Sequence, residues 1–166
     1  MNYIKLKEKK DIFKLGIMDE KDNIVLDENG NEVCLEFDLA DINLPLRYNK
    51  CVNDIETAKR KLKNQIIIID KKQDHKGKKM LSANEEAKAK AIRQFFKDME
   101  EAMDLFLGKD GTKKFLNGRN PYWEMFDDLS EAIEPFMKDM KLSVNDMTNR
   151  IKEKYKLEES DILKNE

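Results

Sequence analysis

The stretch that decides the fold is residues 84–140, NEEAKAKAIRQFFKDMEEAMDLFLGKDGTKKFLNGRNPYWEMFDDLSEAIEPFMKDM. Its first half repeats apolar side chains every three or four residues, the period that lines one helical face: Ile92, Phe95, Phe96, Met99, Met103 and Phe106. Gly-rich turns follow, and Pro121 then suits the first turn of a helix, where no donor is needed. A second apolar stripe comes after it: Trp123, Phe126, Leu129, Ile133, Phe136, Met137 and Met140. The stretch predicts two amphipathic helices joined by a short connection.

Strand-like segments precede these helices. Residues 13–17 and 24–26 are largely apolar and flank a polar turn, and Asn29-Gly30 tolerates the positive φ values of a tight hairpin. Residues 33–37 alternate apolar and polar side chains, which is the period of a half-buried strand. The segments predict a small antiparallel β-meander with one face on the helices. No internal repeat is evident in the chain.

A connector is predicted between the meander and the helical body. Pro45 disfavours a helix through residues 38–49, and either Asn49 or Asn53 is then the cap of the next helix. Residues 66–69 are four isoleucines, which suit either the end of that helix or a buried strand. The Lys-rich segment 70–82 has no apolar period, and we expect it to be a flexible insert.

Two helix-start signals complete the prediction. Ser82 and Glu85 have the spacing of a capping box, so a long helix is expected to follow them. Ser143 begins a similar signal, which predicts a short last helix through Tyr155. Residues 157–166 are highly charged and are predicted to be a disordered tail.

The predicted fold class is therefore α+β and mostly α. A small N-terminal antiparallel β-meander is followed by a bundle of about four to five helices. We expect the meander and connector over residues 1–48 and the helical body over residues 49–156, within one compact domain. A chain of 166 residues is long enough for one such core.

The charge pattern excludes several classes of protein. Basic and acidic residues number 32 and 34 and are mixed along the chain, which argues against a nucleic-acid-binding surface. The longest aliphatic run, residues 66–69, is too short to cross a membrane. Residues 1–10 lack the apolar core of a secretory leader, so we expect a reduced, cytoplasmic protein. Cys34 and Cys51 are expected to be packing residues, although their spacing does not exclude a disulfide.

Catalytic and metal-binding patterns are missing from the sequence. The one histidine, His75, lies in the Lys-rich segment, which shows no sign of the ordered shell that a catalytic imidazole needs. One histidine and two cysteines cannot supply the four ligands of a zinc site. The acidic turns at 19–22 and 27–32 lack the ligand spacing of a calcium loop, and residues 108–114 lack that of a phosphate loop. We expect no catalytic residue, no metal and no cofactor in a protein that is not an enzyme.

The apolar stripes leave two interpretations. Residues that share one helical face most often form the core. Alternatively, part of this surface stays open to hold an apolar helix of a partner, a task for which flexible Met side chains are suited.

The order of segments resembles that of a known family. The motifs FxLGI (residues 13–17) and DLADI (38–42) precede the helical body. Within the body lie AMDx3Gx2Gx3F (102–115) and Px4FxDx4I (121–133). Over residues 13–155 the chain is similar to the small tail assembly chaperones of long-tailed bacteriophages and prophages of Gram-positive bacteria.

This resemblance implies a function in virion assembly. Members of the family bind the long, apolar, helical tape measure protein before the tail tube polymerises around it, in the cytoplasm of the bacterial host. The chaperone hypothesis includes self-association, and the absence of binding to nucleic acid or membrane is predicted from the mixed charges and the short aliphatic run described above. The partner-binding candidates, for the groove or its supporting core, are Phe106, Phe115, Trp123, Phe126, Met99 and Met103.

Two other functions stay open at this point. One is a small phage regulator or anti-defence adaptor that binds a host protein. The other is a structural component of the tail or baseplate. The sequence does not determine the oligomeric state or which apolar residues face outward.

Overall fold

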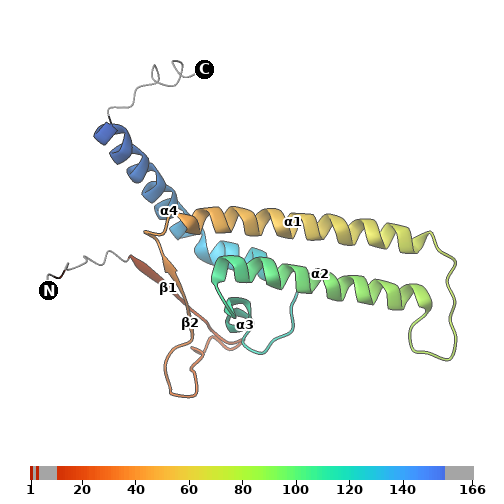
Figure 1. Ribbon diagram of the computed structural model, residues 1–166. Helices are drawn as coiled ribbons and strands as arrows, with labels where there is room; N and C mark the ends of the chain where they lie inside the picture. The colour runs from red at the N-terminus through yellow and green to blue at the C-terminus, as the bar shows by residue number, and fades with distance from the viewer. Residues whose placement is uncertain (2, 4–10, 156–166) are drawn as a thin grey trace, which may run out of the picture.

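The computed structural model describes residues 1, 3 and 11–155, so the tail predicted at 157–166 lies outside the described residues. The elements in chain order are β1 (Ile12–Gly16), β2 (Cys34–Asp38), α1 (Asn43–Asp70), α2 (Ala83–Leu107), α3 (Gly111–Leu116) and α4 (Met125–Tyr155). This confirms the predicted class, α+β and mostly α. Figure 1 shows α1 and α2 side by side, the sheet at one end of the pair, and α4 running beyond the body.

The sheet is smaller than the predicted meander. β1 pairs antiparallel with β2, placing Phe13 opposite Phe37. Residues 24–26, expected to be a strand, make only isolated bridges on either side, from Ile24 to Met18 and from Leu26 to Glu32. The backbone instead closes a ring: the amide of Ile17 donates to Val33, that of Val33 to Val25, and that of Val25 to Ile17.

The ring reflects an eight-residue repeat, IMDEKDNI at 17–24 and VLDENGNE at 25–32. In each copy the carboxylate of the third residue, Asp19 or Asp27, accepts hydrogen bonds from two following backbone amides. Residues at the sixth position, Asp22 and Gly30, have φ values of 61° and 80°. The expectation of no internal repeat is therefore wrong. Two short copies that share turn chemistry more than side-chain identity are easily overlooked.

Helix α1 begins earlier than the sequence predicted. It starts at Asn43, whose amide donates to Asp41 Oδ1 at 2.9 Å, so neither Asn49 nor Asn53 is its cap. The boundary at residues 48/49 is wrong because Pro45 lies in the first turn, where a helix tolerates a residue without an amide hydrogen. Residues 66–69 are helical, which decides between the two interpretations of the four isoleucines.

Helix α2 begins as predicted. The Ser82 hydroxyl accepts from the Glu85 amide at 3.2 Å, and the Glu85 carboxylate accepts from the Ser82 amide at 2.7 Å, which completes a capping box. The preceding segment 71–82 contains no helix or strand. It is nevertheless tied to α2, because Asp74 Oδ1 accepts from the amide of Asn84 and the Asn84 side chain donates to the carbonyl of Lys72. Flexibility of the insert stays a prediction.

A close contact turns the chain from α2 into α3. Gly108 has φ +89°, a value that L side chains rarely adopt, and it ends α2. A Cβ placed on Gly111 would lie 2.3 Å from the Cβ of Leu107, so only glycine fits there. Asp104 Oδ1 accepts from the amide of Thr112 at 2.8 Å, and the buried Thr112 hydroxyl donates to the carbonyl of Glu100. These contacts fix α3 against α2.

Helix α4 differs from the prediction at both ends. It begins at Met125 and not at Pro121, and it continues without a break to Tyr155. The separate last helix predicted from Ser143 is wrong, because polar residues of capping type are also tolerated on an exposed helical face. Burial ends at Met140, and four large apolar side chains beyond it are exposed: Leu142, Met147, Ile151 and Tyr155.

One hydrophobic core joins all these elements. α1 and α2 contribute most of their inner faces, α4 contributes its first half, and β2 and α3 close one end. Cys51 lies fully inside this core, where burial, with a smaller effect of the nearby Asp54, raises the pKa of its thiol to about 12. Cys34 and Cys51 are both free thiols. Among the residues that the structure describes, no helix is long and apolar enough to cross a membrane.

Candidate binding groove

The six residues predicted to bind a partner separate into two groups. Five are buried in the core: Met99, Met103, Phe106, Phe115 and Phe126. They lie where other helices cover them, so they can support a surface but offer none of their own. Trp123 differs, because it stays 47% exposed. Partner binding itself is still a prediction, and in this structure Trp123 is the one candidate of the six that a partner could touch.

Trp123 stands beside an apolar groove between α1 and α2. The groove has a volume of about 640 Å³. Its aliphatic residues Ile67 and Ile92 are 44% and 40% exposed. The complete lining is Lys59, Arg60, Leu62, Lys63, Ile66, Ile67, Ile92, Phe95 and Trp123. The lining surface is almost wholly apolar, so Lys59, Arg60 and Lys63 line the groove with their hydrocarbon stems, and the Trp123 indole N–H is the one uncharged polar side-chain group among the lining residues.

The segment before α4 holds Trp123 in place. The Arg119 guanidinium donates to the carbonyls of Leu116 and Phe115, at 2.9 and 3.2 Å, and so satisfies the end of α3. The Tyr122 hydroxyl donates to Asp128 Oδ2 at 2.5 Å, which ties the residue before the tryptophan to the first turns of α4. Burial and this hydrogen bond raise the pKa of Tyr122 to about 12, so the hydroxyl keeps its proton at neutral pH.

The indole ring also packs on its neighbours. Its centroid lies 5.1 Å from that of Phe95, at an interplanar angle of 31°. Lys59 Nζ lies 5.9 Å from the centroid of the Trp123 ring, within reach of a cation–π interaction. One side of the ring is therefore held by the body while the rest stays open to solvent.

Charges are distributed unevenly around the α1–α2 pair. The groove is lined by three cations, Lys59, Arg60 and Lys63, and by no carboxylate. A hollow that shares Ile92 with the groove adds two cations and one carboxylate; its charged residues are Arg93, Lys97 and Glu100. A hollow on another flank of α1 has the opposite composition, with one cation and three carboxylates: Lys61, Asp54, Asp98 and Glu101.

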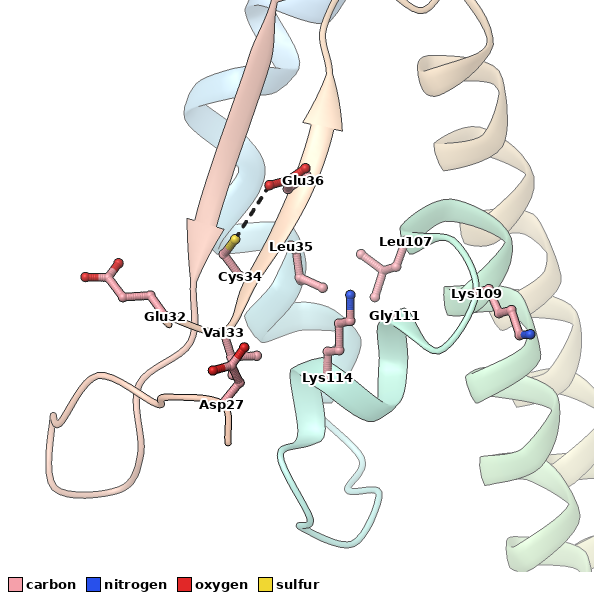
Figure 2. Close-up of a pocket in the computed structure, with 10 residues that line it drawn as sticks. All are labelled: Asp27, Glu32, Val33, Cys34, Leu35, Glu36, Leu107, Lys109, Gly111 and Lys114. Carbon is pink, nitrogen blue, oxygen red and sulfur yellow. Dashed lines mark hydrogen bonds between the residues drawn. The ribbon is translucent and has the colours of Figure 1, made fainter. Parts of the chain in front are cut away.

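A second concave surface lies between β2 and α3 (Figure 2). It has a volume of about 480 Å³, and half of its ten lining residues are charged. Figure 2 shows Lys114 pointing into the hollow, whereas Glu32 and Lys109 point away from it. Glu36 forms an ion pair with Lys14 at 2.6 Å, which keeps the pKa of Glu36 below its ordinary value. The Cys34 thiol donates a long hydrogen bond to Glu36 Oε1, at 4.0 Å (Figure 2), so the hollow places a thiol beside a carboxylate that is already paired with Lys14.

The segment that carries the only histidine, residues 71–82, lies at the opposite end of the helix pair from the sheet. His75 is exposed within segment 71–82, which joins α1 to α2 in Figure 1. Within the described part of the chain, no group of three or more His, Cys, Asp or Glu side chains is placed to hold a metal ion.

Comparisons with models of protein families, with curated proteins and with solved structures found no match to this chain. The interpretation of the groove therefore depends on its own geometry. Aliphatic, aromatic and cationic side chains around an open apolar hollow are suited to binding a partner.

Sequence reasoning missed most of the groove. Ile67 and the three cations lie outside the strongest helical stripes, and those stripes form the core. The available signal was Ile67 with Lys63, Arg60 and Lys59 four, seven and eight residues before it, a spacing that places all four on one face of α1.

Proposed function

We propose that this chain is a non-enzymatic tail assembly chaperone of a long-tailed bacteriophage, acting in the cytoplasm of the bacterial host. Its groove binds an apolar helix of the tape measure protein and keeps that helix from aggregating. The resemblance described above suggests the partner. The single observation that supports the proposal is the half-exposed Trp123 beside an open aliphatic groove.

The shape and chemistry of the groove suit a helix. A partner helix presents side chains at i, i+3, i+4 and i+7, and such a row can lie along a groove between two helices. Exposed Ile67, Ile92 and Trp123 would lose solvent contact on binding, which is the main source of favourable free energy in such a contact. A reversible complex with a charged, folded protein would shield the apolar surface of the tape measure until the tail tube replaces it.

Trp123 provides a direct test because it is the only tryptophan of the chain. A synthetic apolar helix from the tape measure protein is titrated into the full chain while tryptophan emission is recorded. Binding should move the emission to shorter wavelength, since the indole passes from water into an apolar contact.

Two adjacent isoleucines supply a matched pair of variants. Ile67 lines the groove and is 44% exposed, whereas Ile68 lies outside the lining and is 57% exposed. Ile67→Asp should abolish the shift, because it places a charge in the apolar contact, and Ile68→Asp should leave it intact. Equal loss in both variants, or no shift with the unmodified chain, would count against the groove as the binding site.

Co-expression tests the cellular function. The unmodified chain should keep the tape measure protein in the soluble fraction, and the Ile67→Asp variant should not. Tape measure protein that precipitates equally with and without the unmodified chain would refute the chaperone proposal.

A further inference from the structure

We infer that the helix accepted by the groove carries acidic side chains along a border of its apolar stripe. This inference rests on the proposed function and adds the charge of the partner to it. The groove selects, in this view, an acidic amphipathic helix over a neutral or basic one.

The first observation is the composition of the rim. Lys59, Arg60 and Lys63 line the groove without any carboxylate, although the whole chain has a formal net charge of −2. The surface continues past Ile92 to a hollow in which two cations, Arg93 and Lys97, outnumber one carboxylate, Glu100. Cations are therefore concentrated on one apolar surface of a chain whose charges otherwise nearly cancel.

The second observation is the pairing of these cations inside the chain. Lys59 lies 3.4 Å from Glu56 and over the Trp123 ring. The Arg60 guanidinium contacts only a hydroxyl, that of Thr57, at 3.3 Å. Among the ion pairs of the described residues, none includes Arg60 or Lys63. These two cations are available to carboxylates of a partner.

The geometry of the groove favours a peptide over nucleic acid. The floor is apolar, formed by Leu62, Ile66 and the Phe95 ring, and the cations contribute their stems to the lining while their charged ends lie at its border. A nucleic-acid strand needs cations that follow its phosphates and an open aromatic face for its bases. The Trp123 ring is only partly open, because it packs against Phe95 and has Lys59 over it. An apolar floor with a charged border complements an amphipathic helix with acidic flanks.

The test uses three synthetic helices that share one apolar stripe and differ only at the border positions. One has Glu there, one Gln and one Lys. Their affinities for the full chain are measured from Trp123 emission at low and high salt. The Glu helix should bind about tenfold more tightly than the Lys helix at low salt, and the difference should shrink at high salt because exposed charges are screened.

Charge reversal gives the decisive comparison. The double variant Arg60→Glu/Lys63→Glu should prefer the Lys helix. Lys61→Glu is the matched control, since Lys61 is on the same helix but lines the acidic hollow beside Asp98. The Lys61→Glu variant should keep the preference of the unmodified chain for the Glu helix. If the ratio of the affinities for the Glu and Lys helices changes as much in Lys61→Glu as in the double variant, the inference is overturned.

The remaining outcomes separate this inference from the proposed function. Equal affinity for all three helices, with binding still lost in Ile67→Asp, overturns the acidic preference and leaves the groove as a helix-binding site. No binding of any helix overturns the proposed function and this inference together. A single-stranded oligonucleotide that shifts Trp123 emission and displaces the Glu helix would mean that the surface recognises polyanions, which also overturns the inference.

Discussion

Gly111→Ala tests the contact that sets the direction of the chain after α2. The new Cβ would lie 2.3 Å from Leu107 Cβ and 3.5 Å from Leu107 Cγ. A Cβ cannot rotate away, so the backbone of α3 or the end of α2 has to shift. The hydrogen bonds of Thr112 to Asp104 and Glu100 oppose that shift.

The expected magnitude follows from this geometry. Overpacking of a tight contact typically costs about 1–3 kcal/mol. The better helix propensity of alanine recovers at most about 1 kcal/mol, and less at the first residue of a helix such as Gly111. We expect the free energy of unfolding to fall by about 1–2 kcal/mol, which for a domain of this size lowers Tm by roughly 2–8 °C.

Thermal and urea unfolding followed by circular dichroism measures the effect. Gly16→Ala is the control, because nothing lies within 4 Å of a Cβ at Gly16 and its φ is not positive. It should keep the unfolding free energy within about 0.5 kcal/mol of the unmodified chain. Adding Leu107→Gly to Gly111→Ala removes the opposing Cβ, so the double variant should lose less than the sum of the single changes. A Gly111→Ala chain as stable as the unmodified one would refute the close approach of α3 to α2.

Three further predictions concern local interactions. Ser82→Ala removes the hydroxyl of the capping box and should lower the unfolding free energy by about 0.5–2 kcal/mol in urea titrations, whereas an unchanged midpoint would show that the box is not formed. Cys51 is buried and its pKa is raised to about 12, so in the folded chain it should resist a thiol reagent that modifies Cys34 at pH 8. Unfolding should make both thiols reactive, and equal modification rates of the two thiols in the folded chain would contradict the burial of Cys51. Hydrogen bonds from the Asn that ends each turn keep the pKa values of Asp19 and Asp27 below the unfolded value. The two carboxylates therefore stabilise the fold at a pH above their unfolded pKa, and this stabilisation is lost as the pH falls from the unfolded pKa towards the folded pKa. The urea midpoint should decrease below about pH 5, and it should decrease less in an Asp19→Asn/Asp27→Asn variant.

The motif that carries the family resemblance proves to be structural in this chain. Asp104 accepts the amide that starts α3, Gly111 makes room for Leu107, and Phe115 is buried. Asp128 accepts the hydroxyl of Tyr122. These residues build the corner between α2 and α4 and hold Trp123 beside the groove. The motif therefore bears on the fold of the corner more than on any direct contact with a partner.

Helix ends show how far local rules extend. The capping box at Ser82 depends only on side chains and amides three residues apart, so the sequence predicted it correctly. Pro45 and Ser143 misled the prediction because each residue type tolerates two environments. A proline fits the first turn of a helix as well as a connector, and a serine fits an exposed helical face as well as a cap.

The sequence by itself determined the class of fold, the two main amphipathic helices and the turn that separates them, because these depend on periodicity and backbone chemistry within a few residues. It did not determine which apolar residues a partner could reach. Met99 and Phe106 share a helix with Ile92, yet the first two are buried and Ile92 is 40% exposed. The difference arises only when α1, α3 and β2 pack on α2 and cover part of its surface. Exposure depends on contacts between segments far apart in the chain, and only the tertiary structure fixes those.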